Sequence, residues 1–180
     1  MNEDINNKEY TDADKIRVLQ VAKWCHPYIG GIERVVEDIA DGMKKRAEMT
    51  ILVCADGRKT EIETRPDGVT VIRAGTLCKL FSMPISMRYL YWFGRLAPKA
   101  DIIQFHAPFP LSDLALFLHH NKNAVKTVWW HSDVVRQKKL MLVYSRLCVG
   151  SLKILTVYTW RETLFSSSPS ISVTTATAWR

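Results

Sequence analysis

Two patterns of apolar and polar positions alternate along this chain. Short runs of apolar, often β-branched residues, such as Ile16 to Ala22, are typical of buried strands. Longer segments with apolar residues on one helical face, such as Val35 to Met43, are typical of amphipathic helices. The predicted strands are residues 16–22, 49–54, 69–73, 101–105 and 125–130. The predicted helices are one that follows Gly30 and Gly31, one that begins at Ser86, and residues 112–120 and 132–147.

This alternation of strands and helices predicts the fold. Strand–helix–strand units give parallel strands, and successive units place helices on both faces of the sheet. We therefore expect the α/β class, with a doubly wound Rossmann-like parallel sheet. A chain of 180 residues, of which 47% are hydrophobic, can bury one good core. We expect one domain at residues 15–160.

The two ends of the chain differ from this domain in composition. Residues 1–14 carry five acidic residues and one lysine, which predicts a flexible polar leader and not a basic-then-apolar signal peptide. Residues 161–180 are rich in Ser and Thr, with no helical stripe. Two interpretations of this tail stay open: a flexible C-terminus, or a reading frame that ends abnormally so that the natural continuation is missing.

The junction between the first strand and the first helix is the most informative segment. Gly30 and Gly31 connect the two elements at the carboxyl edge of the predicted sheet. Unpaired backbone N–H groups and the helix dipole favour a phosphate at such a place. A tight turn alone also explains two glycines. Glu33 lies in the first helical turn, where a carboxylate faces the positive end of the dipole, so a capping role and contact with a ligand both stay open for it.

Composition narrows the classes of partner. The net charge of +7 favours anionic partners such as nucleotide diphosphates, acidic lipid headgroups or nucleic acid. Nucleic acid is the weakest of these, because no recognition module is present and the basic residues are dispersed. No apolar run is long enough to span a bilayer. The four cysteines are widely separated and form no CxxC pair, which argues against a zinc site and against a disulfide framework. This cysteine usage favours a location of the protein in the reducing cytoplasm.

Residues 79–99 combine basic and apolar side chains. The segment holds four basic residues, no acidic ones and many large apolar or aromatic side chains, among them Leu80, Phe81, Met83, Met87, Tyr91, Trp92 and Phe93. Such a mixture is typical of a peripheral contact with an anionic membrane. A core-packed helix whose cations extend to the solvent explains the same pattern.

Two histidines follow predicted strands. His106 comes after residues 101–105 and His131 after residues 125–130, so we expect both at the same sheet edge as the glycine pair. A hydrogen-bonded structural histidine is the alternative for each. The spacing of the histidines fits no metal site, and His119 and His120 are expected at the surface near a helix end.

Three segments together resemble a known family. KWCHPYIGGIERVVEDIADGM, DIIQFHAPFP and WWHSDVVRQKKLMLVYSRL strongly resemble the N-terminal domain of glycosyltransferase family 4, the retaining GT-B enzymes. The resemblance covers residues 15–147. It implies transfer of a hexose from a nucleotide diphosphate sugar to a saccharide or lipid-linked acceptor, with retention and without a metal or other cofactor, in polysaccharide or glycolipid synthesis. A second domain holds most donor contacts in that family, so the resemblance implies an acceptor-side half that is inactive alone.

The resemblance also implies roles for single residues. His131 matches the family histidine that lies against the donor sugar near the reacting centre. Gly30 and Gly31 are expected to let the donor diphosphate approach the backbone. The expected acceptor pocket consists of His106, Asp133 and Arg136.

Each assignment has an alternative. Asp133 fits a helix N-cap, and Arg136 fits a solvated helix face. The whole chain fits a non-catalytic binding module, either an inactive remnant or a subunit that needs a separate donor domain. A nicotinamide-dependent dehydrogenase does not fit, because the GxGxxG pattern and its ribose-binding acid are absent. The expected location is the cytoplasm, including the inner face of the plasma membrane.

Overall fold

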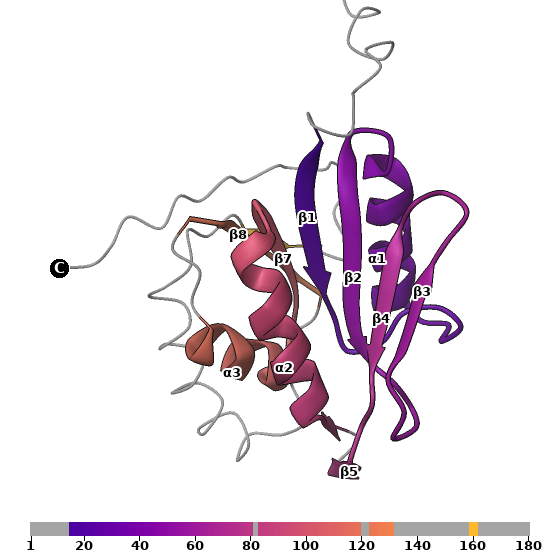
Figure 1. Cartoon of the computed structure of the whole chain (residues 1–180), viewed down its shortest axis with the longest axis vertical. Helices are drawn as coiled ribbons and strands as arrows, with labels where there is room; N and C mark the ends of the chain where they lie inside the picture. The colour runs from indigo at the N-terminus through magenta and orange to yellow at the C-terminus, as the bar shows by residue number, and fades with distance from the viewer. Residues whose placement is uncertain (1–14, 81–82, 120–122, 132–158, 162–180) are drawn as a thin grey trace, which may run out of the picture.

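The structure, a computed structural model, describes residues 15–80, 83–119, 123–131 and 159–161. Within these residues the chain folds into a central sheet with helices on both faces (Figure 1). The polar leader, nearly all of the Ser- and Thr-rich tail, and the helix predicted at 132–147 lie outside the described residues.

The main sheet of the described residues has seven strands in the order β3-β4-β2-β1-β7-β8-β9. All neighbours pair in parallel except β3 with β4. Counting the parallel strands alone, this is the 3-2-1-4-5-6 order of a Rossmann fold, so the predicted fold class is confirmed. The bounds are β1 Ile16–Val21, β2 Ala47–Cys54, β3 Glu61–Thr64, β4 Thr70–Ala74, β7 Ile102–Ala107, β8 Val125–Trp130 and β9 Thr159–Arg161.

The central strands bury side chains on both faces. Val18 of β1 packs with Val36 and Ala40 of helix α1 (Gly31–Met43). Leu19 and Val21, which alternate with Val18, face the opposite core, to which helices α2 (Met87–Leu96) and α3 (Pro110–Leu118) contribute. Figure 1 shows α1 on one side of the sheet and α2 with α3 on the other. Burial on both faces explains why the parallel strands are continuous apolar runs in the sequence.

Four strands were not predicted. β3 lies inside the polar stretch 55–68, and its residues are all exposed, so no apolar pattern marks it. It pairs antiparallel with β4 at the sheet edge, where Arg73 binds Glu63 at 2.7 Å. β5 (Cys78–Leu80) and β6 (Met83–Ile85) form a separate hairpin, and β9 adds a parallel strand beside β8.

The predicted start of α2 at Ser86 is confirmed. The Ser86 hydroxyl accepts a hydrogen bond from the N–H of Tyr89 at 3.0 Å and donates one to the carbonyl of Gly75 at 2.7 Å. One side of α2 belongs to the core, as the core-packed interpretation of residues 79–99 expects, and the other side is exposed. The buried residues are Tyr89, Leu90 and Phe93, and the most exposed apolar ones are Met87 and Tyr91.

Candidate functional site

The candidate site lies at the carboxyl edge of the sheet, between β1 and β7. The strand order reverses there, because β1 is followed by β2 on one side and β7 by β8 on the other. The chain leaves β1 toward α1 on one face and leaves β7 toward α3 on the opposite face (Figure 1). Such diverging connections form the crevice in which open α/β sheets bind ligands.

Three polar side chains form a hydrogen-bonded row at this edge. Gln20 lies in β1, His106 in β7, and His131 directly after β8. His106 Nε2 lies 2.8 Å from Gln20 Oε1, and His106 Nδ1 lies 2.9 Å from His131 Nε2. The two imidazole rings are nearly parallel, with centroids 5.2 Å apart and 16° between their planes. The row therefore crosses three adjacent strands of the sheet.

The members of this row differ in their exposure. Gln20 is fully buried and His106 is 2% exposed. Burial, with a smaller contribution from His131, lowers the pKa of His106 to about 3, so its ring is neutral at neutral pH. His131 is only partly buried, and its backbone N–H donates to the carbonyl of Ala107 at 3.1 Å. His131 is therefore the member of the row that a ligand can reach.

The glycine pair forms the start of α1. Gly30 is the N-cap in an extended conformation with φ −164°, and Gly31 is the first helical residue. Gly68 is the one described glycine with positive φ, so the pair is not required by a left-handed backbone. Apart from its chain neighbours and the backbone of its own helix turn, no heavy atom lies within 4 Å of the place that a Cβ on Gly31 would take, whereas a Cβ on Gly30 would collide with the Glu33 carboxylate.

A lysine that the sequence analysis did not single out lies near this helix start. Lys23 follows β1, and burial lowers its pKa, while the charge of Glu33 partly opposes that shift. Two lysines lie over the ring of Trp24. The distance from Nζ to the ring centroid is 5.9 Å for Lys23 and 5.3 Å for Lys79. A lysine near a helix start, such as Lys23, favours an anionic ligand.

A cleft of about 590 Å³ opens at the same edge, beside the carboxyl ends of β1, β2 and β4. Its walls include the loop residues His26 and Tyr28, and Arg58 in the segment after β2. Arg73 also lines it, and this guanidinium donates to the carbonyl of His26 at 3.0 Å. The cleft therefore has charged and aromatic walls close to the glycine loop.

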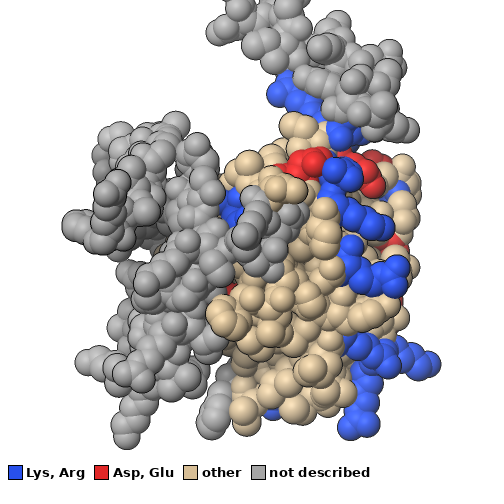
Figure 2. Space-filling view, turned by 60° about the vertical axis from the view of Figure 1, so that its left-hand side comes forward, with Lys and Arg blue, Asp and Glu red and all other residues tan. Residues whose placement is uncertain are grey.

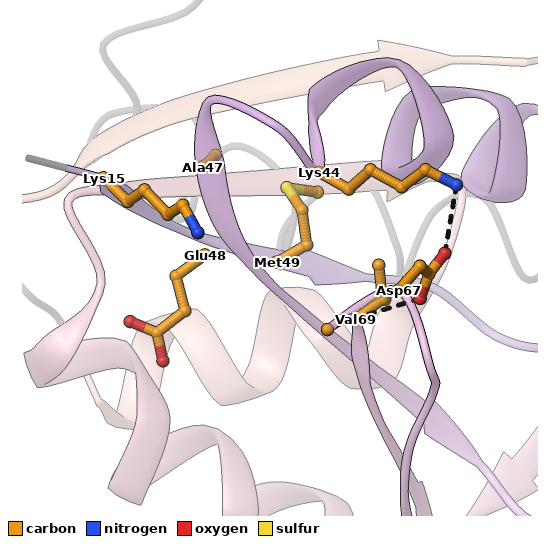
Figure 3. A pocket seen from close by; sticks show the side chains of 8 residues that line it. Lys15, Lys44, Ala47, Glu48, Met49, Asp67 and Val69 are labelled. Carbon is orange, nitrogen blue, oxygen red and sulfur yellow. Dashed lines mark hydrogen bonds and ion pairs between the residues drawn. The ribbon is translucent and has the colours of Figure 1, made fainter. Parts of the chain in front are cut away.

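A second cleft, of about 390 Å³, lies at the opposite edge of the sheet (Figure 3). Lys15, Glu48 and Val69 line it, each at or near the amino end of a strand. Lys44 closes one side through an ion pair with Asp67 at 3.1 Å. We do not place the site here, because ligands of this fold bind at the carboxyl ends of the strands.

The structure thus brings together some of the predicted site residues. His106 and His131 touch each other, and Gly30 and Gly31 begin the helix that packs against β1. Asp133 and Arg136 lie outside the described residues. The burial of His106 and the engagement of both its ring nitrogens favour the structural alternative for this residue over a wall of the acceptor pocket.

Sequence reasoning missed Gln20 and Lys23. Gln20 is a polar residue within an otherwise apolar part of a strand, and this was the available signal. His119, expected at the surface, is exposed and lies over Gly94 of α2. Within the described ranges no three His, Cys, Asp or Glu residues gather in a way that would hold a metal ion.

Comparisons with known proteins point to one family. A family model described as Glycosyltransferase Family 4 matches residues 29–165. O-antigen chain mannosyltransferase C of Escherichia coli is 33% identical over 133 residues, which cover 73% of this chain and 36% of that protein. D-rhamnosyltransferase WbpZ of Pseudomonas aeruginosa is 30% identical over 135 residues, which cover 73% of this chain and 35% of that protein.

The chain therefore spans about a third of the length of these curated relatives. No solved structure matches it significantly.

Proposed function

Because this chain belongs to glycosyltransferase family 4, we propose that it forms the acceptor-side half of an enzyme that transfers a hexose from a nucleotide diphosphate sugar. The proposed acceptor is a saccharide or a lipid-linked saccharide, and the proposed reaction retains the anomeric configuration. The observation that carries the proposal is the position of His131 at the carboxyl edge of the sheet, beside the switch point.

The names of the relatives support a narrower proposal for the sugar. One is a mannosyltransferase of the O-antigen chain, and the other is a D-rhamnosyltransferase. D-rhamnose is the 6-deoxy form of mannose, so both names describe the same ring configuration. We therefore propose a donor of the mannose configuration and a role in the synthesis of a surface polysaccharide.

The start of α1 is the proposed place for the donor diphosphate. The open space at Gly31 leaves room for a phosphate against the backbone N–H groups, which the helix dipole makes favourable. Lys23 adds a positive charge nearby. Oriented N–H donors and a cation stabilise negative charge that grows on a leaving diphosphate, so we propose no metal for this step.

Steady-state kinetics test the proposal in a two-domain enzyme, either a longer natural form or this chain supplied with a donor domain. We expect His131→Ala to lower kcat by about 10²-fold or more, by analogy with the loss of one charge-stabilising group. We expect Gly31→Val to lower turnover as well, because a side chain there fills the proposed phosphate space. The assay follows sugar transfer from labelled GDP- and UDP-sugars, including GDP-mannose.

His119→Ala is the matched control, because this exposed histidine lies over α2 and away from the row. It should keep the turnover of the unchanged enzyme. Near-normal turnover of both His131→Ala and Gly31→Val in folded protein would contradict the proposed site. This chain alone, without a donor domain, should release no nucleotide above background.

A binding module without catalysis is the alternative. In that case the two-domain protein would bind a nucleotide sugar, as calorimetry measures, and would transfer none of it to any acceptor offered.

We also propose a peripheral contact with an anionic membrane through residues 79–99. None of the helices in the described part of the chain has the length and apolar character to cross a bilayer. Met87 and Tyr91 are 62% and 55% exposed and share one stripe of α2 with Arg95, whose guanidinium donates to the Tyr91 hydroxyl at 2.9 Å. Apolar and basic groups on one exposed stripe suit a surface of acidic lipids.

A further inference from the structure

We propose that Gln20 and His106 are positioning residues that hold the His131 ring in one orientation, with a proton on Nε2. The place of His131 beside a sugar rests on the proposed function, whereas the proton on Nε2 rests on the hydrogen bonds of the row. The argument follows the row from its buried end to its accessible end.

The first step is the orientation of the Gln20 amide. Gln20 Nε2 lies 3.3 Å from the backbone carbonyl oxygen of Val36 in α1, so this nitrogen donates to that oxygen. Its Oε1 then faces His106 at 2.8 Å. The flipped amide would place two oxygens, which only accept, against each other in a fully buried place. The carbonyl of Val36 therefore sets the direction of the first hydrogen bond.

The second step is the tautomer of His106. An amide oxygen cannot donate, so His106 Nε2 must carry the proton that it shares with Gln20 Oε1. A neutral imidazole carries one proton, which makes His106 Nδ1 an acceptor. Burial favours the neutral ring, and the lowered pKa of His106, about 3, agrees with this state.

The third step is the tautomer of His131. His106 Nδ1 accepts at 2.9 Å, so His131 Nε2 must donate the proton between them. In a neutral His131 ring the other nitrogen, Nδ1, has no proton, and any group that contacts it must donate a hydrogen bond. The opposite tautomer would offer a donor at Nδ1 and would lose the bond to His106.

Nuclear magnetic resonance of this chain tests the tautomer directly. Long-range ¹H–¹⁵N correlation at neutral pH distinguishes the protonated nitrogen of each imidazole from the unprotonated one. We expect the His131 proton on Nε2, and a scalar coupling through the hydrogen bond between His131 Nε2 and His106 Nδ1. A His131 proton on Nδ1 would overturn the proposal.

Gln20→Met removes the acceptor for His106 at similar side-chain size. We expect this variant to weaken the coupling and to leave His131 as a mixture of tautomers. Gln104→Met is the matched control, because Gln104 lies opposite Gln20 on β7 and accepts instead from the Thr127 hydroxyl at 3.1 Å. It should keep the spectrum of the unchanged protein. Unaltered ring ¹⁵N signals of His131 in Gln20→Met would overturn the proposal. If a variant does not fold, the spectrum of the unchanged protein still tests the tautomer.

Kinetics of the two-domain enzyme separate this inference from the proposed function. Gln20→Met should lower kcat on the order of tenfold, by analogy with the loss of a hydrogen-bond partner behind a metal-ligating histidine. It should lower kcat no further in a His131→Ala background. If His131→Ala keeps full turnover, the proposed function of the site fails, and the spectrum still tests the positioning of His131. If turnover needs His131 while the spectrum shows the other tautomer, only the positioning proposal fails.

Discussion

His106 is a histidine that the protein keeps uncharged. Its pKa is lowered to about 3, first by burial and then by His131, whereas an unfolded histidine titrates near about 6.5. Among the described residues, the titratable group that faces its ring is His131, and its other neighbour in the row is the uncharged Gln20. The unfolded chain therefore binds a proton at His106 over a pH range in which the folded chain does not.

This difference predicts a pH dependence of stability. Between the two pKa values the unfolded state holds more protons, so the free energy of unfolding falls as the pH falls below about 6.5. From pH 7 to pH 5 we expect a loss of about 2 kcal/mol from this residue. Urea unfolding at both pH values measures it. His106→Gln should lose most of this dependence, and an equal dependence in both proteins would contradict the prediction.

Residue by residue, the sequence was informative where a special residue follows a strand. His106 and His131 each follow a predicted strand, Gly31 begins a helix, and the topology brings the strand ends to one edge. Gln20 was missed because a polar residue within a strand does not reveal which side chain will bind it. Its hydrogen-bond partner, His106, is 86 positions away in the sequence, and only the pairing of β1 with β7 makes them neighbours.

At the scale of an element, Ser86 fixes the start of α2. Its hydroxyl is fully buried and makes two hydrogen bonds, one as the helix cap and one to the carbonyl of Gly75. Ser86→Ala should lower the free energy of unfolding by about 1–2 kcal/mol, because it removes a cap and leaves buried backbone groups without partners. Chemical denaturation measures the loss.

Ser112→Ala is the comparison for this prediction. Ser112 is also buried, but its hydroxyl makes one bond, to the carbonyl of Phe109 at 2.7 Å. Its loss should be smaller. A loss at Ser112 that equals or exceeds the one at Ser86 would show that the cap is not what holds the start of α2.

The elements that were predicted are those whose residues are buried. β8 was predicted at its observed bounds, and β1, β2, β4 and β7 within a few residues. All residues of β3 and β5 are exposed, so the pattern of apolar residues does not predict either strand. Their pairing comes from contacts with β4 and β6 and not from their own composition.

At the scale of the whole molecule, the basic residues are unevenly placed on the face that Figure 2 shows. On this face, Lys and Arg side chains lie mostly along one side, while Asp and Glu gather near the upper end (Figure 2). Such an arrangement favours contact with an extended anionic partner and makes that contact sensitive to salt.

Vesicle co-sedimentation tests the proposed membrane contact. The chain should bind vesicles with acidic lipids at low salt and dissociate at high salt, since each basic residue near the surface adds about 1 kcal/mol. Changing Met87 and Tyr91 together to serine should weaken binding. Ile62→Ser should not, because Ile62 is 57% exposed but lies on β3 at the sheet edge. No binding of the unchanged chain at low salt would rule out the contact.

Helix α1 meets both parts of the candidate site. Its first residue, Gly31, stands at the proposed phosphate position, and the carbonyl of Val36 orients the buried end of the imidazole row. Five residues of a helix span about 7.5 Å, and helices resist stretching because each turn is closed by hydrogen bonds. The helix therefore fixes the distance between the proposed phosphate position and the imidazole row. Insertions in the loop before Gly30 should change how substrate enters and leave this spacing as it is.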